Sequence, residues 1–213
     1  MPSSRYHLDA TPNPNPFDYR ANIAGERDRE ARLTVETVDN HIYFYADVDS
    51  DRCLALIRAV READSQLRSE HVSRGMEGMP LTPIWLHIHS YGGSLFTAFS
   101  VADQLAMIKS PIYSVVEGIC ASAGTLLSMS CTRRYILPSS FMLIHQLSGM
   151  VWGTHEQFKD EMTLQNKIMD RLIEFYVAKS KVTAEEIRNM LTRDFWMDAQ
   201  QCVELGFVDE ILR

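Results

Sequence analysis

Hydrophobic and polar residues alternate along some stretches of the chain, while other stretches repeat their hydrophobic residues every three or four positions. The first alternating stretches are residues 33–38 and 41–46, with Asp39 and Asn40 between them. Alternation over four to eight residues is typical of a strand, and this residue pair favours a tight turn. The region therefore predicts a β-hairpin.

Helical spacing follows the hairpin and continues through Val60, with Asp49 or Ser50 as the capping residue. Residues 68–83 contain two glycines and two prolines and predict a surface loop.

Strands and helices alternate from there to the C-terminus. We expect strands over residues 84–89, 112–116 and 134–145, and helices over residues 94–108, 123–129, 154–178 and 183–191. Thr183 and Glu186 have the spacing of a capping box at the start of the last helix. Such alternation predicts an α/β fold with a mainly parallel sheet covered by helices.

The N-terminal segment differs from the rest in composition. Residues 1–30 are polar and contain three prolines, so we expect a flexible arm there and one domain over residues 31–213. A chain of 213 residues suits one domain with a full core.

Charge and cysteine usage narrow the classes of function. The net charge of −7 and the lack of a basic run argue against nucleic-acid binding, and no apolar stretch reaches membrane-spanning length. The N-terminus lacks the apolar core of a secretory signal, so we expect a cytoplasmic protein. The four cysteines are widely spaced without a metal-ligand rhythm. We therefore expect no metal and no cofactor.

Three residues could together provide nucleophilic catalysis. Ser122 lies where a strand passes through a small-residue turn into a helix, whose N-terminal N–H groups can stabilise negative charge. A serine hydroxyl needs a base, for which His145 at the end of an apolar strand is the best candidate, and Asp194 could orient the imidazole. Taken singly, each has a structural interpretation: a helix cap, a hydrogen-bonded strand-end histidine and a surface carboxylate.

A second element supports the chemical interpretation. Residues 89–94 close a strand and open a helix, and the paired glycines Gly92 and Gly93 allow the backbone to approach a ligand closely. Such a turn can present N–H groups to a developing oxyanion. A tight turn that needs positive φ accounts for one glycine better than for two.

These segments resemble the proteolytic subunits of the Clp protease family, from about Val35 to the C-terminus. Four motifs in the same order carry the resemblance: Ser90-x-Gly92-Gly93, Gly118-x-x-Ala121-Ser122-x-Gly124, Arg134-Tyr135-x-Leu137-Pro138-x-Ser140-x-Met142-x-Ile144-His145-Gln146, and Arg193-Asp194-x-Trp196-Met197-x-Ala199. Four ordered motifs are far more specific than a single serine–glycine pattern.

The resemblance implies a crotonase-like α/β subunit with a protruding helical handle, assembled into heptameric rings, two of which enclose a chamber. It implies a serine endopeptidase that acts on small peptides and unfolded proteins. Ser122 would be the nucleophile, His145 the base and Asp194 the orienting carboxylate. The N–H groups of Gly92 and Ala123 would bind the oxyanion.

The resemblance also implies how substrate and neighbouring subunits bind. Gly93 and a segment that begins with Ser148, Gly149 and Met150 would pair with extended substrate by strand addition. The helix over residues 154–178 would be the handle where rings meet.

The chain departs from the family at positions that concern its partners. Trp85 and His87 stand where the family places two aromatic residues of the docking pocket for an AAA+ unfoldase, and only Trp85 keeps that character. Thr192 stands where the family often has an acidic residue that pairs with the arginine matched by Arg193, and this pair commonly bridges two rings. The sequence therefore favours a heptameric ring over a double ring and leaves the unfoldase partnership open.

Three other functions are weighed against the peptidase. The acyl-CoA hydratases and isomerases share the crotonase-like fold but do not need a Ser/His/Asp set. A signal-peptide-peptidase relative would use a serine–lysine pair, and no lysine here has a motif for that role. A non-catalytic subunit that co-assembles with an active homologue is the third alternative. The complete Ser/His/Asp set argues against it, while the altered docking positions and the N-terminal arm leave it open.

Overall fold

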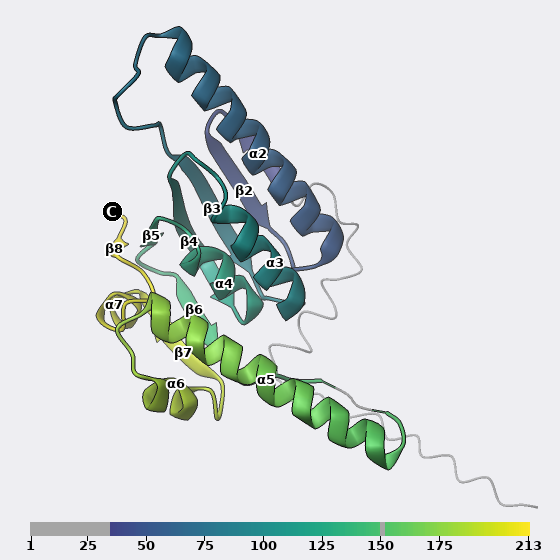
Figure 1. The fold of residues 1–213 in the computed structure, drawn as a ribbon. Helices are drawn as coiled ribbons and strands as arrows, with labels where there is room; N and C mark the ends of the chain where they lie inside the picture. Colours follow the sequence, from purple (N-terminus) through teal and green to yellow (C-terminus); the bar gives the residue numbers. More distant parts are fainter. Residues whose placement is uncertain (1–34, 150–151) are drawn as a thin grey trace, which may run out of the picture. The chain divides into compact units, whose positions relative to one another are not determined.

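The computed structural model describes residues 35–149 and 152–213, so the arm expected over residues 1–30 lies outside the described residues. The described residues belong to one compact unit built on an eight-stranded sheet (Figure 1). The strands are β1 (Val35–Val38), β2 (His41–Tyr45), β3 (Ile84–Ser90), β4 (Ile112–Ala121), β5 (Arg133–Ile136), β6 (Phe141–Ile144), β7 (Phe195–Asp198) and β8 (Glu210–Ile211). The helices are α2 (Ser50–Ser73), α3 (Leu95–Leu105), α4 (Ala123–Met129), α5 (His155–Lys179), α6 (Ala184–Met190) and α7 (Ala199–Glu204).

The sheet is mainly parallel, as the alternation of strands and helices predicts. Its order is β1-β2-β3-β4-β5-β8, and β6 pairs with both β4 and β7. The hairpin β1–β2 and the pair β6–β7 are antiparallel, and the remaining pairs are parallel. The predicted hairpin is confirmed, with Asp39 at a φ of 54° in its turn.

Helix caps agree with the sequence, but one helix is longer than expected. Asp49 caps α2, and Thr183 forms a capping box with Glu186 at the start of α6. The surface loop predicted over residues 68–83 is wrong in its first part, because α2 continues to Ser73. The helix ends just before Gly75, whose φ of 64° suits a glycine that follows a helix.

The strand predicted over residues 134–145 is two strands. The first half of β4 pairs with β5, and its second half pairs with β6. Gly118 changes the direction of β4 between these halves, with a φ of 74°. Its N–H donates to Ser140 Oγ at 2.7 Å, which holds the turn between β5 and β6 against this bend. The bend is what sends the end of β4 toward β6.

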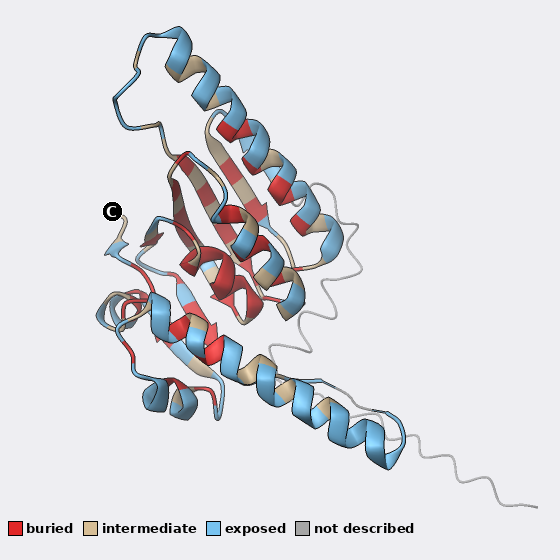
Figure 2. Ribbon diagram, viewed as in Figure 1, coloured by how far each residue is buried: buried red, intermediate tan, exposed pale blue. Residues whose placement is uncertain are grey.

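One face of the sheet packs against α2, α3 and α4 and forms the core (Figure 2). Alternate residues of β3 point into it, and Ile84, Leu86 and Ile88 are fully buried. The four cysteines are free and buried, as their apolar surroundings predict. Burial raises the pKa of Cys53 to about 11, so its thiol is protonated and unreactive at neutral pH.

The opposite face of the same strands carries a ladder of histidine and aromatic rings. His41 Nδ1 and His87 Nε2 share a hydrogen bond of 2.9 Å, and His87 Nδ1 bonds to Glu117 Oε1 at 2.7 Å. Tyr45 donates its hydroxyl to the other oxygen of Glu117. Tyr43 stacks on His87 with ring centroids 4.4 Å apart. Both ring nitrogens of His87 and both carboxylate oxygens of Glu117 therefore have partners within the ladder.

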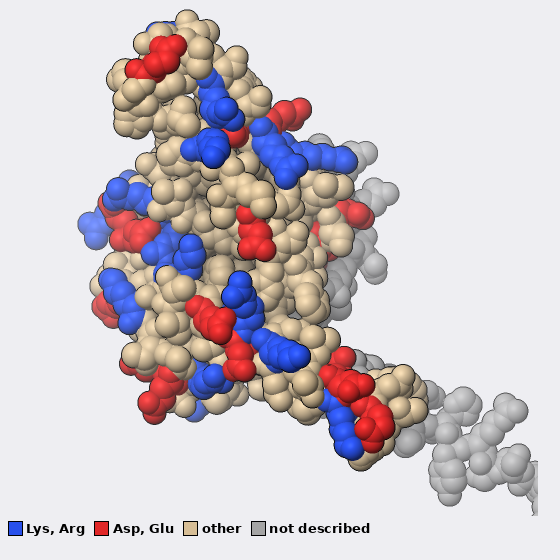
Figure 3. All heavy atoms as spheres, in the orientation of Figure 1, with Lys and Arg blue, Asp and Glu red and all other residues tan. Residues whose placement is uncertain are grey.

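Helix α5 is buried only near its C-terminus. Its buried residues are Leu172, Ile173 and Tyr176, whereas Phe158 and Met162 nearer its start are exposed (Figure 2). On the face drawn in Figure 3, Lys and Arg side chains lie among Asp and Glu side chains, so neither sign dominates that face. Among the described residues, no helix is long and apolar enough to cross a membrane.

Candidate active site

Ser122 occupies a strained turn between β4 and α4. Its φ of 52° and ψ of −126° are unusual for a residue other than glycine. The serine stands at the N-cap position, yet its side chain makes no capping hydrogen bond. The interpretation of Ser122 as a helix cap is therefore wrong. Strain of this kind costs about 1–3 kcal/mol and is typical of functional turns, including the nucleophile turn of hydrolases.

Two further hydroxyl groups hold this turn in place through hydrogen bonds. Thr125 Oγ1 lies 2.6 Å from the Ser122 carbonyl oxygen, to which it donates, and 2.8 Å from the Tyr176 hydroxyl. Because the single proton of Thr125 is used on the carbonyl, Tyr176 is the donor in the second bond. The sequence analysis missed both residues. Thr125 could have been noticed by its spacing of three from Ser122, but Tyr176 is brought in by tertiary packing alone.

The glycine turn after β3 lies directly against Ser122. A Cβ atom on Gly92 would stand 2.6 Å from Ser122 Cβ and 2.7 Å from the Ala121 carbonyl oxygen. Gly93 has a φ of 145°, and a Cβ there would stand 2.5 Å from the Val48 carbonyl oxygen. Both positions therefore require glycine: Gly92 because its backbone lies against Ser122, and Gly93 because its backbone lies against Val48.

The backbone amides near Ser122 differ in their partners. The Gly92 N–H donates to Ser90 Oγ at 3.2 Å. Ala123 is the first residue of α4, so its N–H belongs to the first turn, where no carbonyl of the helix can accept it.

His145 follows β6, the strand that pairs with the end of β4. Ala121 pairs with Leu143, and the Ser122 N–H donates to the Leu143 carbonyl oxygen at 2.8 Å. His145 therefore stands two residues beyond the point where Ser122 touches β6. Its Nδ1 donates to the Gln146 carbonyl oxygen at 2.6 Å.

Asp194 precedes β7, which pairs with β6 from the other side. The antiparallel register pairs Leu143 with Trp196 and Ile144 with Phe195. The pairing ends at Ile144 and Phe195, so His145 and Asp194 are the next residues along the two strands, beyond the last pair. Ser122, His145 and Asp194 thus each lie next to an end of one of three neighbouring strands, β4, β6 and β7.

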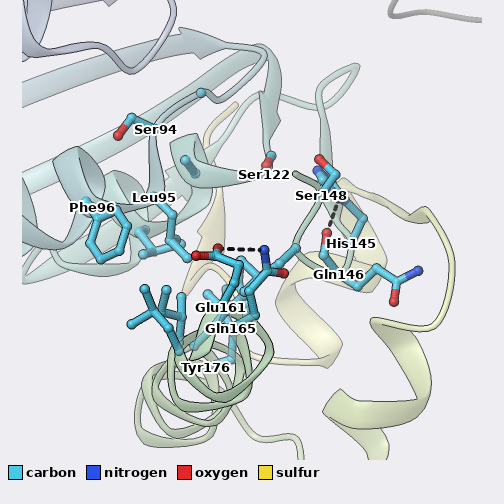
Figure 4. A pocket seen from close by; sticks show the side chains of 17 residues that line it. Ser94, Leu95, Phe96, Ser122, His145, Gln146, Ser148, Glu161, Gln165 and Tyr176 are labelled. Atoms are coloured by element: carbon cyan, nitrogen blue, oxygen red, sulfur yellow. Dashed lines mark hydrogen bonds between the residues drawn. The ribbon is translucent and has the colours of Figure 1, made fainter. Parts of the chain in front are cut away.

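A cavity of about 330 Å³ opens beside Ser122 and His145 (Figure 4). The elements that line it are the start of α3, the start of α4, the segment after His145, and α5. Its lining residues include Gly93, Ser94, Leu95, Phe96, Ser122, Ala123, Leu126, His145, Gln146, Leu147, Ser148, Glu161, Leu164, Gln165, Ile168, Leu172 and Tyr176. A volume near 300 Å³ is the lower end of the range for ligand pockets and suits a single side chain. The contribution of α5 was not predicted.

The predicted substrate-binding residues lie partly within this site. Gly93 and Ser148 line the cavity. Gly149 follows Ser148, and a Cβ on it would stand 3.4 Å from the Gln165 amide nitrogen of α5. Met150 lies outside the described residues.

Comparisons with known proteins agree with the resemblance found in the sequence. The Clp protease family model matches residues 38–213. The ATP-dependent Clp protease proteolytic subunit 1 of Protochlamydia amoebophila is 35% identical over 137 residues, which are 62% of this chain and 66% of that protein. The protein of the same name in Chlamydia muridarum is 36% identical over 137 residues, covering 62% and 71%.

A relative from a different bacterial group matches to the same degree. The ATP-dependent Clp protease proteolytic subunit of Streptococcus mutans is 34% identical over 133 residues, covering 61% of this chain and 68% of that protein. The matched part thus spans about two thirds of the length of these relatives.

Proposed function

This chain belongs to the Clp protease family, and we propose that it is a serine endopeptidase of small peptides and unfolded proteins. The observation that carries the proposal is that Ser122, His145 and Asp194 each lie next to an end of one of three neighbouring strands. The free hydroxyl of Ser122 in its strained turn supports the same conclusion, because a residue that only capped α4 would use that hydroxyl on the helix.

In the proposed reaction, Ser122 Oγ attacks the scissile carbonyl carbon while His145 takes the hydroxyl proton on Nε2. The imidazolium then gives this proton to the leaving amine, and water hydrolyses the acyl-enzyme by the same steps. Asp194 would orient the ring through Nδ1. That nitrogen donates to the Gln146 carbonyl oxygen in this structure. Activity therefore requires His145 Nδ1–H to turn from Gln146 to Asp194.

The negative charge that develops on the substrate carbonyl oxygen needs donors fixed in advance. The Ala123 N–H, at the start of α4, is well suited, and the Gly92 backbone lies against Ser122. The Gly92 N–H would have to shift from Ser90 Oγ to serve as the second donor. Each such donor contributes about 3 kcal/mol to stabilisation of the transition state.

Substrate would bind as an extended strand along Gly93 and the segment that begins with Ser148, Gly149 and Met150. Backbone pairing of this kind tolerates many sequences, as a peptidase of unfolded proteins requires. The cavity beside Ser122 would take the side chain before the scissile bond.

We further propose that the subunits form a heptameric ring in the cytoplasm, with α5 as the handle in any contact between two rings. The exposed side chains of Phe158, Met162 and Leu164 support this role, since α5 leaves apolar surface uncovered near its start. The hydroxyl of Thr192 donates to the Asn189 carbonyl oxygen and brings no charge to a ring contact. Partnership with an AAA+ unfoldase would use the sheet face that carries Trp85 and His87.

A non-catalytic subunit that co-assembles with an active homologue is the second candidate. The hydrogen bond from His145 Nδ1 to Gln146 favours it, because a subunit without catalysis has no need to release that bond.

Hydrolysis of fluorogenic peptides by the purified full chain, beside Ser122→Ala, separates the two candidates. Native mass spectrometry of the same samples reports the ring size. We expect the seven-subunit form to hydrolyse these peptides, and we expect Ser122→Ala to abolish the hydrolysis. An assembled ring that hydrolyses no peptide would refute the peptidase and leave the modulatory subunit.

A further inference from the structure

Tyr176 is a buried residue of α5 whose hydroxyl group reaches the turn that carries Ser122. Only 2% of Tyr176 is exposed, and its ring lies beside that of Phe207 with ring centroids 5.7 Å apart. Its hydroxyl donates to Thr125 Oγ1 over 2.8 Å, while its ring lines the cavity beside Ser122 (Figure 4). A residue far along the chain is thus linked to the nucleophile turn by one hydroxyl group.

The Ser122 carbonyl oxygen accepts two hydrogen bonds, both from Thr125. The Thr125 backbone nitrogen lies 3.0 Å from this oxygen, and Thr125 Oγ1 lies 2.6 Å from it. The Ser122 carbonyl and the Ala123 N–H belong to one planar peptide group, in which they point in opposite directions. Because Thr125 fixes the carbonyl, it also fixes the direction of the Ala123 N–H, the oxyanion donor of the proposed reaction.

Tyr176 controls which way the Thr125 hydroxyl points. A threonine within a helix divides between two side-chain rotamers. The hydrogen bond from Tyr176 is made in the rotamer that also reaches the Ser122 carbonyl, so it favours that rotamer. A hydroxyl that accepts a hydrogen bond is also polarised and donates its own more strongly. Both effects hold the peptide group between Ser122 and Ala123 in one orientation.

We propose that Tyr176 and Thr125 are positioning residues that aim the Ala123 N–H at the oxyanion. The inference rests on the proposed function, because it concerns the transition state of that reaction. The strained backbone of Ser122, with its φ of 52°, needs such support, since a strained turn persists only where its surroundings hold it. The oxyanion forms only after attack on the carbonyl, so the support acts on the transition state and not on substrate binding.

The test begins with Tyr176→Phe, which removes the hydroxyl and keeps the ring that lines the cavity. On the assembled full chain with fluorogenic peptides, we expect kcat to fall about tenfold, the factor that corresponds to one hydrogen bond, while KM stays within about twofold. Thr125→Val should lower kcat at least as much, and Thr125→Ser, which restores the hydroxyl, should recover most of the loss. Because Tyr176 acts through Thr125, the double variant Tyr176→Phe/Thr125→Val should fall no further than Thr125→Val alone.

Ser114→Ala is the matched control for loss of a buried hydroxyl. Ser114 Oγ lies 3.0 Å from Ser128 Oγ, and both residues are fully buried. This pair joins β4 to α4, the two elements that flank Ser122, but neither of its residues lines the cavity. Ser114→Ala should therefore lower Tm to a similar extent as Tyr176→Phe and leave kcat unchanged.

The outcomes distinguish this inference from the function on which it rests. A kcat for Tyr176→Phe within twofold of the unaltered chain, or losses that simply add in the double variant, would overturn the positioning role while the peptidase stands. An equal fall in kcat for Ser114→Ala would also overturn it, because general loosening of α4 would then account for the loss. An assembled ring of the unaltered chain that hydrolyses no peptide would overturn both the positioning role and the peptidase.

Discussion

Replacing Gly92 by alanine tests whether the glycine turn holds Ser122 in place. Gly92 has a φ of 96°, and its backbone lies against the nucleophile turn. The added methyl group would stand 2.6 Å from Ser122 Cβ, 2.7 Å from the Ala121 carbonyl oxygen and 3.0 Å from the Ala123 nitrogen. These contacts are with backbone and Cβ atoms, which cannot rotate away. Ser122 or the glycine turn must therefore move.

The cost of this substitution has two parts. The left-handed backbone costs a residue with a Cβ about 1–2 kcal/mol. Relief of the overlap by backbone shifts costs about 1–3 kcal/mol more. The sum of about 2–5 kcal/mol corresponds to a fall in Tm of about 4–20 °C for a chain of this size. Displacement of a nucleophile by about 1 Å lowers the rate about 100-fold.

Gly78→Ala is the matched control. Gly78 has a φ of 89°, close to that of Gly92, but a Cβ there would meet nothing within 4 Å. Gly78→Ala should therefore lose only the backbone cost of about 1–2 kcal/mol in the free energy of unfolding and should keep full activity. Differential scanning fluorimetry measures Tm, and the fluorogenic peptide assay measures kcat/KM. If Gly92→Ala matched Gly78→Ala in both, the close approach would have no part in positioning Ser122.

Three further predictions concern other parts of the molecule. Asp194→Asn should lower kcat about 10⁴-fold with little change in Tm, since the imidazole would lose its orienting carboxylate; activity within tenfold of the unaltered chain would exclude that role. Burial and the neighbouring His87 lower the pKa of His41 from 6.5 in the folded chain. As the pH drops through about 6.5, the unfolded chain therefore binds a proton at His41 before the folded chain does, and the free energy of unfolding falls. Urea titrations across this pH range should show a smaller fall in the free energy of unfolding for His41→Phe. Arg134 donates from Nη2 to Asp209 Oδ1 at 2.5 Å and from Nη1 to two backbone carbonyl oxygens. Arg134→Lys should cost about 1–3 kcal/mol in chemical denaturation, because one ammonium group cannot replace the planar fork; an unchanged midpoint would contradict this.

The sequence predicted those elements whose signal lies within a few neighbouring residues. Thr183 with Glu186 predicted a helix start, and residues 84–89 predicted a strand, which the structure has as β3. The paired glycines predicted a close approach of the backbone to a ligand, and the structure shows Gly92 lying close to Ser122.

Features that depend on tertiary pairing were not predicted. β7 and β8 are short strands that need β6 and β5 beside them, so their own residues carry little signal. The break between β5 and β6 follows from the bend at Gly118 in a different strand. The polar end of α2 has no apolar stripe strong enough to separate it from a loop.

The candidate catalytic site depends both on local sequence signals and on tertiary pairing, so the sequence predicted only part of it. The sequence placed Ser122 and His145 at the ends of strands, but it did not predict β7, the strand that starts one residue after Asp194 and pairs with β6. Likewise, the amphipathic pattern of α5 contains no sign that Glu161 and Gln165 line a cavity beside Ser122.

The identity of the nucleophile is tested most directly by covalent labelling with a fluorophosphonate. The reagent reacts with a serine hydroxyl only where a neighbouring base activates it. Peptide mass spectrometry of the labelled full chain should locate the adduct on Ser122, and Ser122→Ala and His145→Ala should each abolish it. An adduct on another serine, or an assembled ring that takes up no label, would contradict the account.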